Sequence, residues 1–248
     1  MDPFNNQPQS PPPAPKRSRE FHNLMTRGEK IAGWIWLAVH VVLLPQLIAV
    51  AAAYMLSRGR MPDDLTLNIW YYLIGLVFLL VTQFKFFREN YHIFTGNMRN
   101  ALITMLLAFG ILIVFGRLFA LLTSLFGPLP SSPNQEAVEE LATADMRRMA
   151  ASAVIMAPIV EEALFRGMIF GSIRPKNRIL AYVVSMVVFS LYHVWQYALM
   201  YRSLTPLVSG AAYLPIAFVL AFCYDRTESI WTPIFFHMFY NALALSII

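Results

Sequence analysis

The chain of 248 residues is 58% hydrophobic and 13% charged, with a formal net charge of +5 and a mean hydropathy of +0.54. Soluble globular domains have about 45–50% apolar and about 25% charged residues, so this composition excludes an ordinary soluble protein and predicts an integral membrane protein. The Lys and Arg residues stand in short clusters between apolar runs, which excludes a nucleic-acid-binding protein and indicates that the charges set membrane orientation.

Residues 1–30 precede the first apolar run and form a separate segment. The stretch PQSPPPAPKRSRE is rich in Pro and Ser and then becomes basic. Such a composition cannot bury a hydrophobic core, so we expect a disordered, Pro-rich and basic cytoplasmic tail. We expect no cleavable signal peptide, because the first long apolar run starts only near Ile31.

Seven apolar runs follow the tail, and a membrane span needs about 20 residues to cross about 30 Å of hydrocarbon. The sequence therefore predicts an all-α, polytopic membrane bundle of about seven transmembrane helices, with N-terminal helices in 31–130 and a second unit in 131–248. Aromatic residues near the predicted ends, Tyr71 and Tyr72 among them, are expected in the interfacial belts. The predicted spans are residues 31–56, 67–84, 101–126, 149–171, 179–200, 207–224 and 230–248.

Lys and Arg predict the orientation of these spans. If the N-terminus is cytoplasmic, the cytoplasmic segments 1–30, 85–100, 172–178 and 225–229 carry twelve of these residues and the opposite side carries five. The positive-inside rule then favours a cytoplasmic N-terminus and an odd number of spans. The short chain and its short loops favour a bacterial inner (plasma) membrane. The twelve are Lys16, Arg17, Arg19, Arg27, Lys30, Lys85, Arg88, Arg99, Arg174, Lys176, Arg178 and Arg226, and the five are Arg58, Arg60, Arg147, Arg148 and Arg202.

The connection before the fourth span is predicted to be helical. Ser132 is a candidate N-cap, Pro133 suits the first helical position, and Gln135 completes a capping-box pattern. We therefore expect a surface helix that leads into the span. Inside that span, Pro158 is expected to kink the helix or to free a backbone carbonyl.

Three charged residues lie in the middle of the fourth apolar run, in PIVEEALFRG. A charged residue at the centre of a membrane helix costs about 2.5–3.5 kcal/mol, so Glu161, Glu162 and Arg166 must face a protein interior or a wet cavity. Glu162 and Arg166 are four residues apart and can form an ion pair on one helical face. Glu161 is rotated by about 100° from Glu162, which leaves it as the freer carboxylate.

Two later spans carry polar groups at similar depth. Phe189 and His193 are four residues apart in VVFSLYHVWQY, and His237 and Asn241 are four apart in PIFFHMFYNALA. Because three separate helices each deliver polar side chains to buried depth, we expect Glu161, His193 and His237 to share one site.

These residue types suit hydrolysis of an amide. A carboxylate and a histidine can activate water as a general base, and a second histidine and an Asn carboxamide can donate hydrogen bonds to an oxyanion. Glu161, His193 and His237 are also the ligand set of a hydrolytic zinc site, although the single-helix H-E-x-x-H pattern is absent. Cys223 is the only cysteine in the chain, which excludes a cysteine metal cluster and an internal disulfide framework.

The ordered motifs resemble the CPBP family of type II CAAX prenyl proteases and their bacterial relatives, including proteins linked to bacteriocin processing and self-immunity. The resemblance is carried by E-E-x-x-x-R, then F-x-x-x-H, then H-x-x-x-N on successive membrane helices, over about residues 130–248. The matching positions are Glu161, Glu162, Arg166, Phe189, His193, His237 and Asn241.

The resemblance implies a catalytic core over 131–248, with helices around a conical cavity, and an endopeptidase that cuts lipidated or membrane-associated proteins. It implies that Glu161 and His193 activate the attacking water, that His237 and Asn241 form the oxyanion hole, and that Glu162 and Arg166, with Phe189, support them. We expect no cofactor, and zinc at the three catalytic side chains is the alternative. The expected partners are a peptide or protein substrate and the lipid bilayer, not nucleic acid.

Other interpretations remain open from the sequence. The Glu162–Arg166 pair and the His237 and Asn241 side chains each have a structural interpretation as interhelical contacts. A non-catalytic membrane scaffold or bacteriocin-immunity protein would keep the same fold. A proton-coupled transporter would also place Glu161 in a membrane helix, but no inverted repeat relates the two halves.

Overall fold

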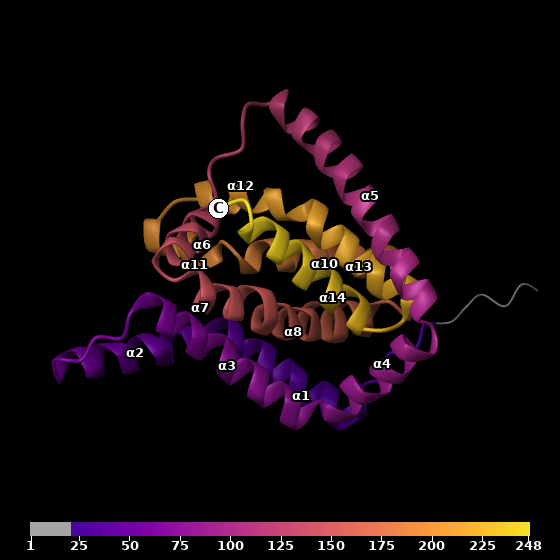
Figure 1. The fold of residues 1–248 in the computed structure, drawn as a ribbon, viewed down its shortest axis with the longest axis horizontal. Coiled ribbons are helices and arrows are strands. Elements are labelled where there is room, and N and C mark those ends of the chain that lie inside the picture. Colours follow the sequence, from indigo (N-terminus) through magenta and orange to yellow (C-terminus); the bar gives the residue numbers. More distant parts are fainter. Residues whose placement is uncertain (1–20) are drawn as a thin grey trace, which may run out of the picture.

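The computed structural model describes residues 21–248, and all regular structure in that range is helical (Figure 1). Three short segments, η1, η2 and η3, are π-helical, and η4 is a 3₁₀ turn. In chain order the elements are α1 (Arg27–Ala38), η1 (Val39–Leu43), α2 (Leu44–Ser57), α3 (Asp64–Thr82), α4 (Phe84–Gly96), α5 (Met98–Ser124), α6 (Pro133–Ala144), α7 (Met146–Ala150), η2 (Ala151–Met156), α8 (Ala157–Glu162), η3 (Ala163–Phe170), α9 (Gly171–Ile173), α10 (Arg178–Tyr192), α11 (Trp195–Tyr201), α12 (Thr205–Ser209), η4 (Gly210–Tyr213), α13 (Leu214–Thr227) and α14 (Trp231–Leu245).

The all-α membrane bundle is confirmed, and the protein is an integral membrane protein. Four described helical runs are long and apolar enough to cross a membrane, and the pair α10–α11, bent by 44°, would be a fifth. Each of the seven expected spans coincides with a helix or a continuous run of helices, but the number seven stays a prediction. The run from α7 to α9 holds three central charges, and α14 has only 15 residues. The four long runs are Arg27–Ser57, Asp64–Thr82, Met98–Ser124 and Thr205–Thr227.

The segment just before α1 differs from the expected tail. Thr26 and Glu29 form a reciprocal capping box at the start of α1, and the Glu29 carboxylate also accepts the backbone N–H of Phe86 at 2.9 Å. Phe21 and Met25 are buried in the main core. Residues 21–30 are therefore packed against the bundle, because their apolar and capping groups find partners on other helices. Residues 1–20, where the rest of the expected tail lies, fall outside the described residues.

Helix α6 forms as expected, but its first residues are used differently. Pro133 occupies the first helical position, yet the Ser132 side chain makes no capping bond. Instead, the Ser132 hydroxyl and the Asn134 amide each lie 3.0 Å from the Tyr213 hydroxyl. The expected capping box is thus replaced by an anchor that ties α6 to η4, because a nearby phenol competes for the same side chains.

The segments η1, α3 and α8 approach closely where a glycine faces a buried imidazole. His40 lies in η1 and stacks on Tyr71 with ring centroids 4.2 Å apart. A Cβ atom added at Gly75 would lie 2.9 Å from His40 Cε1 and 3.2 Å from Val160 Cγ1. Val160 directly precedes Glu161, so this contact positions the helix that carries the freer carboxylate.

Replacing Gly75 with Ala is expected to lower the free energy of unfolding by about 1–3 kcal/mol, because the added methyl group overpacks this three-helix contact. Denaturant unfolding of the protein in detergent micelles measures the change. Gly110→Ala in α5 is the matched control, because no atom lies within 4 Å of its added Cβ. An equal loss in both variants would contradict the packing role of Gly75.

Candidate active site

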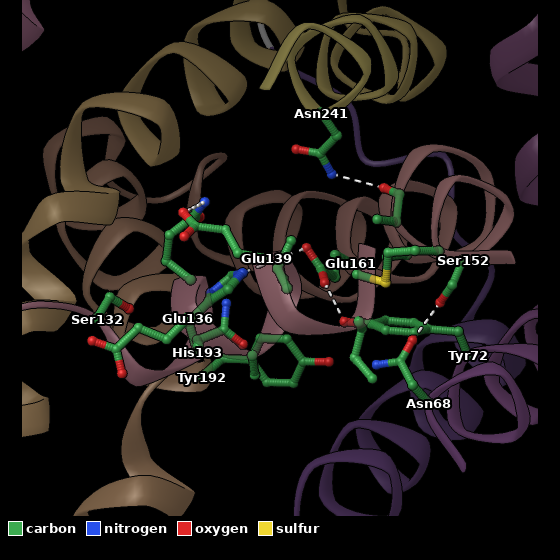
Figure 2. Close-up of a pocket in the computed structure, with 18 of the residues that line it drawn as sticks. Asn68, Tyr72, Ser132, Glu136, Glu139, Ser152, Glu161, Tyr192, His193 and Asn241 are labelled. Atoms are coloured by element: carbon green, nitrogen blue, oxygen red, sulfur yellow. Dashed lines mark hydrogen bonds and ion pairs between the residues drawn. The ribbon is translucent and has the colours of Figure 1, made fainter. Parts of the chain in front are cut away.

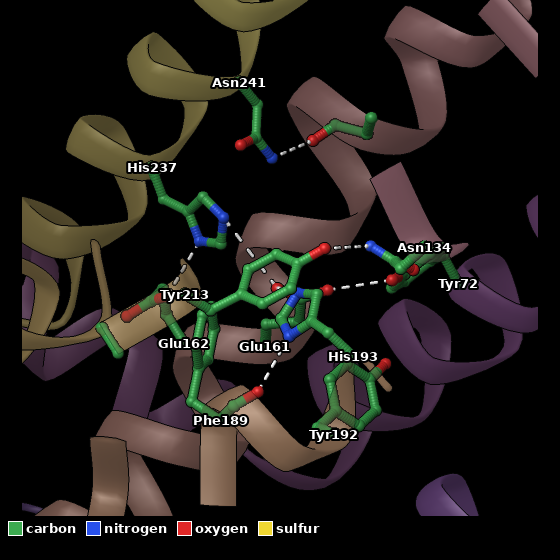
Figure 3. Close-up of polar contacts among 12 residues, drawn as sticks. Tyr72, Asn134, Glu161, Glu162, Phe189, Tyr192, His193, Tyr213, His237 and Asn241 are labelled. Atoms are coloured by element: carbon green, nitrogen blue, oxygen red, sulfur yellow. Dashed lines mark hydrogen bonds and ion pairs between the residues drawn. The ribbon is translucent and has the colours of Figure 1, made fainter. Parts of the chain in front are cut away.

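Three helices bring the polar side chains of the motifs to one cavity of about 1040 Å³. Glu161 comes from α8, His193 caps the end of α10, and His237 comes from α14. Figure 2 shows Glu161 and His193 at this cavity, and Figure 3 shows Glu161, His193 and His237 facing one another across the space between the helices. The expectation of a shared pocket is therefore met for Glu161, His193 and His237.

The two imidazoles lie at equal distances from one carboxylate oxygen. His193 Nε2 and His237 Nε2 are each 3.9 Å from Glu161 Oε2. This separation is too long for a direct hydrogen bond. It leaves room for a water molecule held by the carboxylate and an imidazole. All three side chains are nearly buried, so such a water would lie in a surrounding of low polarity.

Tyr72 holds the second oxygen of this carboxylate. Its hydroxyl donates to Glu161 Oε1 at 2.9 Å from α3. The sequence analysis expected Tyr72 in an interfacial aromatic belt, and the structure adds that α3 directs its hydroxyl into the cavity. No local pattern marks such a residue, since the contact joins positions 89 residues apart.

The orientation of His193 is fixed by its own helix end. Nδ1 lies 2.8 Å from the Phe189 carbonyl oxygen. A carbonyl only accepts, so Nδ1 carries the proton and the lone pair of a neutral ring sits on Nε2, toward Glu161. The ring also stacks on Tyr213 with centroids 4.4 Å apart. The bend between α10 and α11 directly after His193 leaves this side chain at the cavity wall.

The Glu162 carboxylate contacts both Arg166 and His237, and so it links an ion pair to the second imidazole. Arg166 Nη1 donates to Glu162 Oε1 at 3.1 Å, and His237 Nδ1 lies 2.9 Å from the same oxygen. Both members of the Glu162–Arg166 pair are fully buried. The i, i+4 pair expected from the sequence is therefore present, and it also orients His237, so that Nε2 faces Glu161.

Arg166 makes two further contacts in the core. Its Nη2 donates to the Ala217 carbonyl at 3.0 Å, and its guanidinium carbon lies 4.3 Å from the centre of the Phe189 ring. Phe189 therefore lies between Arg166 and His193, whose ring centroid is 4.6 Å away. The role of Phe189 as a supporting residue stays a prediction.

Asn241 lines the same cavity but bonds elsewhere. Its amide nitrogen donates to the Ala153 carbonyl at 2.8 Å (Figure 3). Ala153 lies in the π-helical segment η2, where its natural donor five residues later would be Pro158, which has no N–H. Asn241 thus satisfies the carbonyl that Pro158 leaves free. This bond to Ala153 fixes the Asn241 amide, and among the described residues the amide makes no hydrogen bond to His237 or Glu161.

The rim of the cavity carries carboxylates. Helix α6 lies along one side of the mouth and contributes Glu136, Glu139 and Glu140, and α3 contributes Asp64. No Lys or Arg is found among the described residues that line it. Tyr213 connects this rim to the cluster of Glu161, His193 and His237, because it binds α6 and stacks on His193.

An ion pair outside the span ties α3 to α7 near the same mouth. Arg148 donates to both carboxylate oxygens of Asp63, at 3.1 and 3.2 Å, and to the Thr66 hydroxyl at 2.6 Å. The hydrogen bonds from Arg148 and then from Thr66 lower the pKa of Asp63 to about 2. The link therefore stays ionised throughout the pH range in which a membrane protein is handled.

The described residues contain no group of three His, Cys, Asp or Glu side chains arranged to hold a metal ion. Zinc ligands lie about 2.0–2.2 Å from the metal, which brings two ligand atoms on one tetrahedral ion to roughly 3.3 Å from each other. The two separations of 3.9 Å at Glu161 are longer than this. The expectation that no cofactor is needed stays a prediction.

Replacing Tyr72 with Phe is expected to lower the rate of the chemical step at Glu161 by about 10-fold. The change removes a hydrogen bond to a charged carboxylate, which is worth about 1.5–3 kcal/mol, but part of this is recovered by water in the cavity. Single-turnover cleavage at saturating substrate measures the step. Tyr240→Phe is the control, because that ring lines the cavity and its hydroxyl bonds to no member of the cluster. An unchanged rate in Tyr72→Phe would contradict the role of this bond.

Comparisons with known proteins find one matching family and one similar curated protein. Residues 145–243 match the family described as type II CAAX prenyl endopeptidase Rce1-like. The chain is 31% identical over 121 residues to "Putative membrane peptidase YdiL" of Bacillus subtilis (strain 168), a match that covers 48% of this chain. The chain spans 45% of the length of that relative. No solved structure matches the chain.

Proposed function

We propose that the protein is an intramembrane endopeptidase, on the ground that residues 145–243 match the family described as type II CAAX prenyl endopeptidase Rce1-like. In this proposal it hydrolyses peptide bonds of lipidated or membrane-associated proteins with water activated by glutamate and histidine. The observation that carries the proposal is the equal separation of 3.9 Å from Glu161 Oε2 to Nε2 of His193 and of His237.

Glu161 is the general base in this mechanism. Its carboxylate takes a proton from the water while the water oxygen bonds to the carbonyl carbon of the substrate. His193 holds the same water through the Nε2 lone pair. When the tetrahedral intermediate collapses, the carbon–nitrogen bond breaks and the proton on Glu161 passes to the departing amine. The products are a carboxylic acid and an amine, and Glu161 returns to its ionised form.

His237 is the hydrogen-bond donor to the oxyanion in this proposal. Its Nδ1 lies 2.9 Å from the Glu162 carboxylate, and its Nε2 is the ring nitrogen that faces Glu161 and the substrate. Asn241 keeps one amide hydrogen beyond its bond to Ala153, and this hydrogen is its contribution to the oxyanion hole.

Metal-free catalysis is part of the proposal. Hydrolysis is expected to continue at the same rate after exhaustive chelation, because the groups that activate water and bind the oxyanion are all side chains. Loss of cleavage on chelation, with recovery on adding zinc, would instead favour a zinc site at Glu161, His193 and His237.

The proposed location is a bacterial inner membrane with the N-terminus in the cytoplasm. This rests on the distribution of Lys and Arg between the two sides of the predicted spans. The cleavage event would take place at the depth of Glu161, inside the bilayer, where the cavity admits water.

Quantitative analysis of protein termini tests the function. Membranes containing the wild-type protein or the Glu161→Gln variant are compared, and the expected result is a set of new termini that form only with the wild type. The Glu140→Gln variant is the control for the loss of one carboxylate from the same cavity. If both variants give the wild-type fragments, the protein is not this kind of protease and a non-catalytic scaffold or immunity role is favoured.

A further inference from the structure

The bundle has two ends with different charge. We call the basic face the end formed by the start of α1, by α4 and the start of α5, by the α9–α10 turn and by the end of α13 with the α13–α14 turn. The α6 face is the opposite end, formed by the α2–α3 turn, by α6 and the start of α7, by the α11–α12 turn and by the end of α14. Figure 1 shows α4 at one end of the bundle and α6, α11 and the far end of α2 at the other.

Lys and Arg are concentrated on the basic face. Among the described residues it carries nine of them and the α6 face carries five. Each Lys or Arg beside an anionic cytoplasmic leaflet contributes about 1 kcal/mol, so this excess favours a cytoplasmic basic face. The nine are Arg27, Lys30, Lys85, Arg88, Arg99, Arg174, Lys176, Arg178 and Arg226, and the five are Arg58, Arg60, Arg147, Arg148 and Arg202.

Part of this charge is held firmly at the basic face. Asp225 is buried and accepts hydrogen bonds from Arg174, from Arg178 and from the Tyr182 hydroxyl at 3.1 Å. Only one of the two arginines is neutralised by this carboxylate, and Lys176 lies exposed in the same turn. The turn between α9 and α10 therefore keeps its net positive charge at a fixed place on the bundle.

The catalytic cavity opens at the other end. Its lining comes from the first turns of α3, from α6, from α7 and η2, from α11 and from the last turns of α14. Among the described residues, none of the lining belongs to α4, to α9 or to the first half of α10. Glu161 lies 15 residues after the start of α7 at Met146, which is about 22 Å along the helix from the α6 face. Water and peptide therefore reach Glu161 from the α6 face.

We infer that the substrate is a peptide segment on the non-cytoplasmic side of the membrane, and this inference rests on the proposed function. The basic face fixes the cytoplasmic side, and the mouth lies at the opposite end. The substrate class is thus an exported or translocated segment, and not a tail that remains in the cytoplasm. Helix α6, tied to Tyr213, forms the edge over which the segment enters.

Cysteine labelling tests the orientation, and the chain offers a matched pair of sites. Cys223, the only natural cysteine, is buried, so it is expected to contribute little maleimide labelling of its own. Thr143 in α6 and Thr95 in α4 are both exposed, and each hydroxyl bonds to the carbonyl four residues earlier, at 2.9 and 3.0 Å. Thr143→Cys is expected to react with a membrane-impermeant maleimide in intact cells, whereas Thr95→Cys is expected to react only after permeabilisation. The reverse pattern, or equal labelling of both, would overturn the inference.

The position of the cut sites gives a second readout. Termini that depend on Glu161 are expected to map to substrate segments on the non-cytoplasmic side, and a bulky maleimide on Thr143→Cys in intact cells is expected to reduce their formation at least several-fold. Glu161-dependent termini confined to cytoplasmic segments would overturn the inference and leave the protease function standing. A third outcome is the expected labelling pattern without any termini that depend on Glu161. That result would contradict the protease function but would still support the proposed orientation.

Discussion

Replacing Glu161 with Gln is expected to lower the rate of peptide-bond cleavage by about 10²–10⁴-fold without unfolding the protein, because a carboxamide cannot take the proton from water. Gln has nearly the same shape, and its carbonyl oxygen can still accept the Tyr72 hydroxyl that donates to the carboxylate at 2.9 Å. Cleavage of a substrate segment by the purified protein in liposomes, under single-turnover conditions, measures the rate.

The same experiment needs a control for charge and for folding. Glu140→Gln removes a carboxylate from the rim of the same cavity and is expected to change the rate by less than about twofold, because exposed charges are screened. The melting temperature of Glu161→Gln should stay close to that of the wild type. A Glu161→Gln protein that is folded and cleaves at the wild-type rate would remove Glu161 from the mechanism.

Replacing Arg166 with Met is expected to lower the free energy of unfolding by about 3–5 kcal/mol, because it leaves the buried charge of Glu162 without its guanidinium. Both side chains are fully buried, and Arg166 also loses its bond to the Ala217 carbonyl. Denaturant unfolding in detergent measures the loss. Arg88→Met is the matched control and is expected to cost less than about 0.5 kcal/mol, since that side chain is exposed on α4, outside the long apolar spans.

A double replacement separates the structural and the chemical parts of this cluster. Arg166→Met combined with Glu162→Gln is expected to recover most of the lost stability, because no unpaired buried charge remains. Cleavage is expected to stay at least about 10-fold slower, because His237 has lost the carboxylate that holds its ring in place. Full recovery of both properties would show that Glu162 and Arg166 only hold the helices together.

The sequence determined the features that depend on one helix at a time. Its apolar composition required a membrane bundle, and the period of about 3.6 residues placed Glu162 and Arg166 on one face with Glu161 turned away. The structure has that pair at 3.1 Å. The depth of Glu161, His193 and His237 along their spans also indicated a shared site, because charged and polar groups cannot face lipid.

Only the tertiary structure decided which groups on different helices meet. Tyr72 reaches Glu161, His237 reaches Glu162, and Asn241 satisfies the carbonyl of Ala153. These contacts depend on how far each helix is rotated and shifted against its neighbours, which side-chain packing sets and a single-chain pattern does not record. The side on which the cavity opens has the same origin, since it follows from where α6 and the helix ends come together around the site.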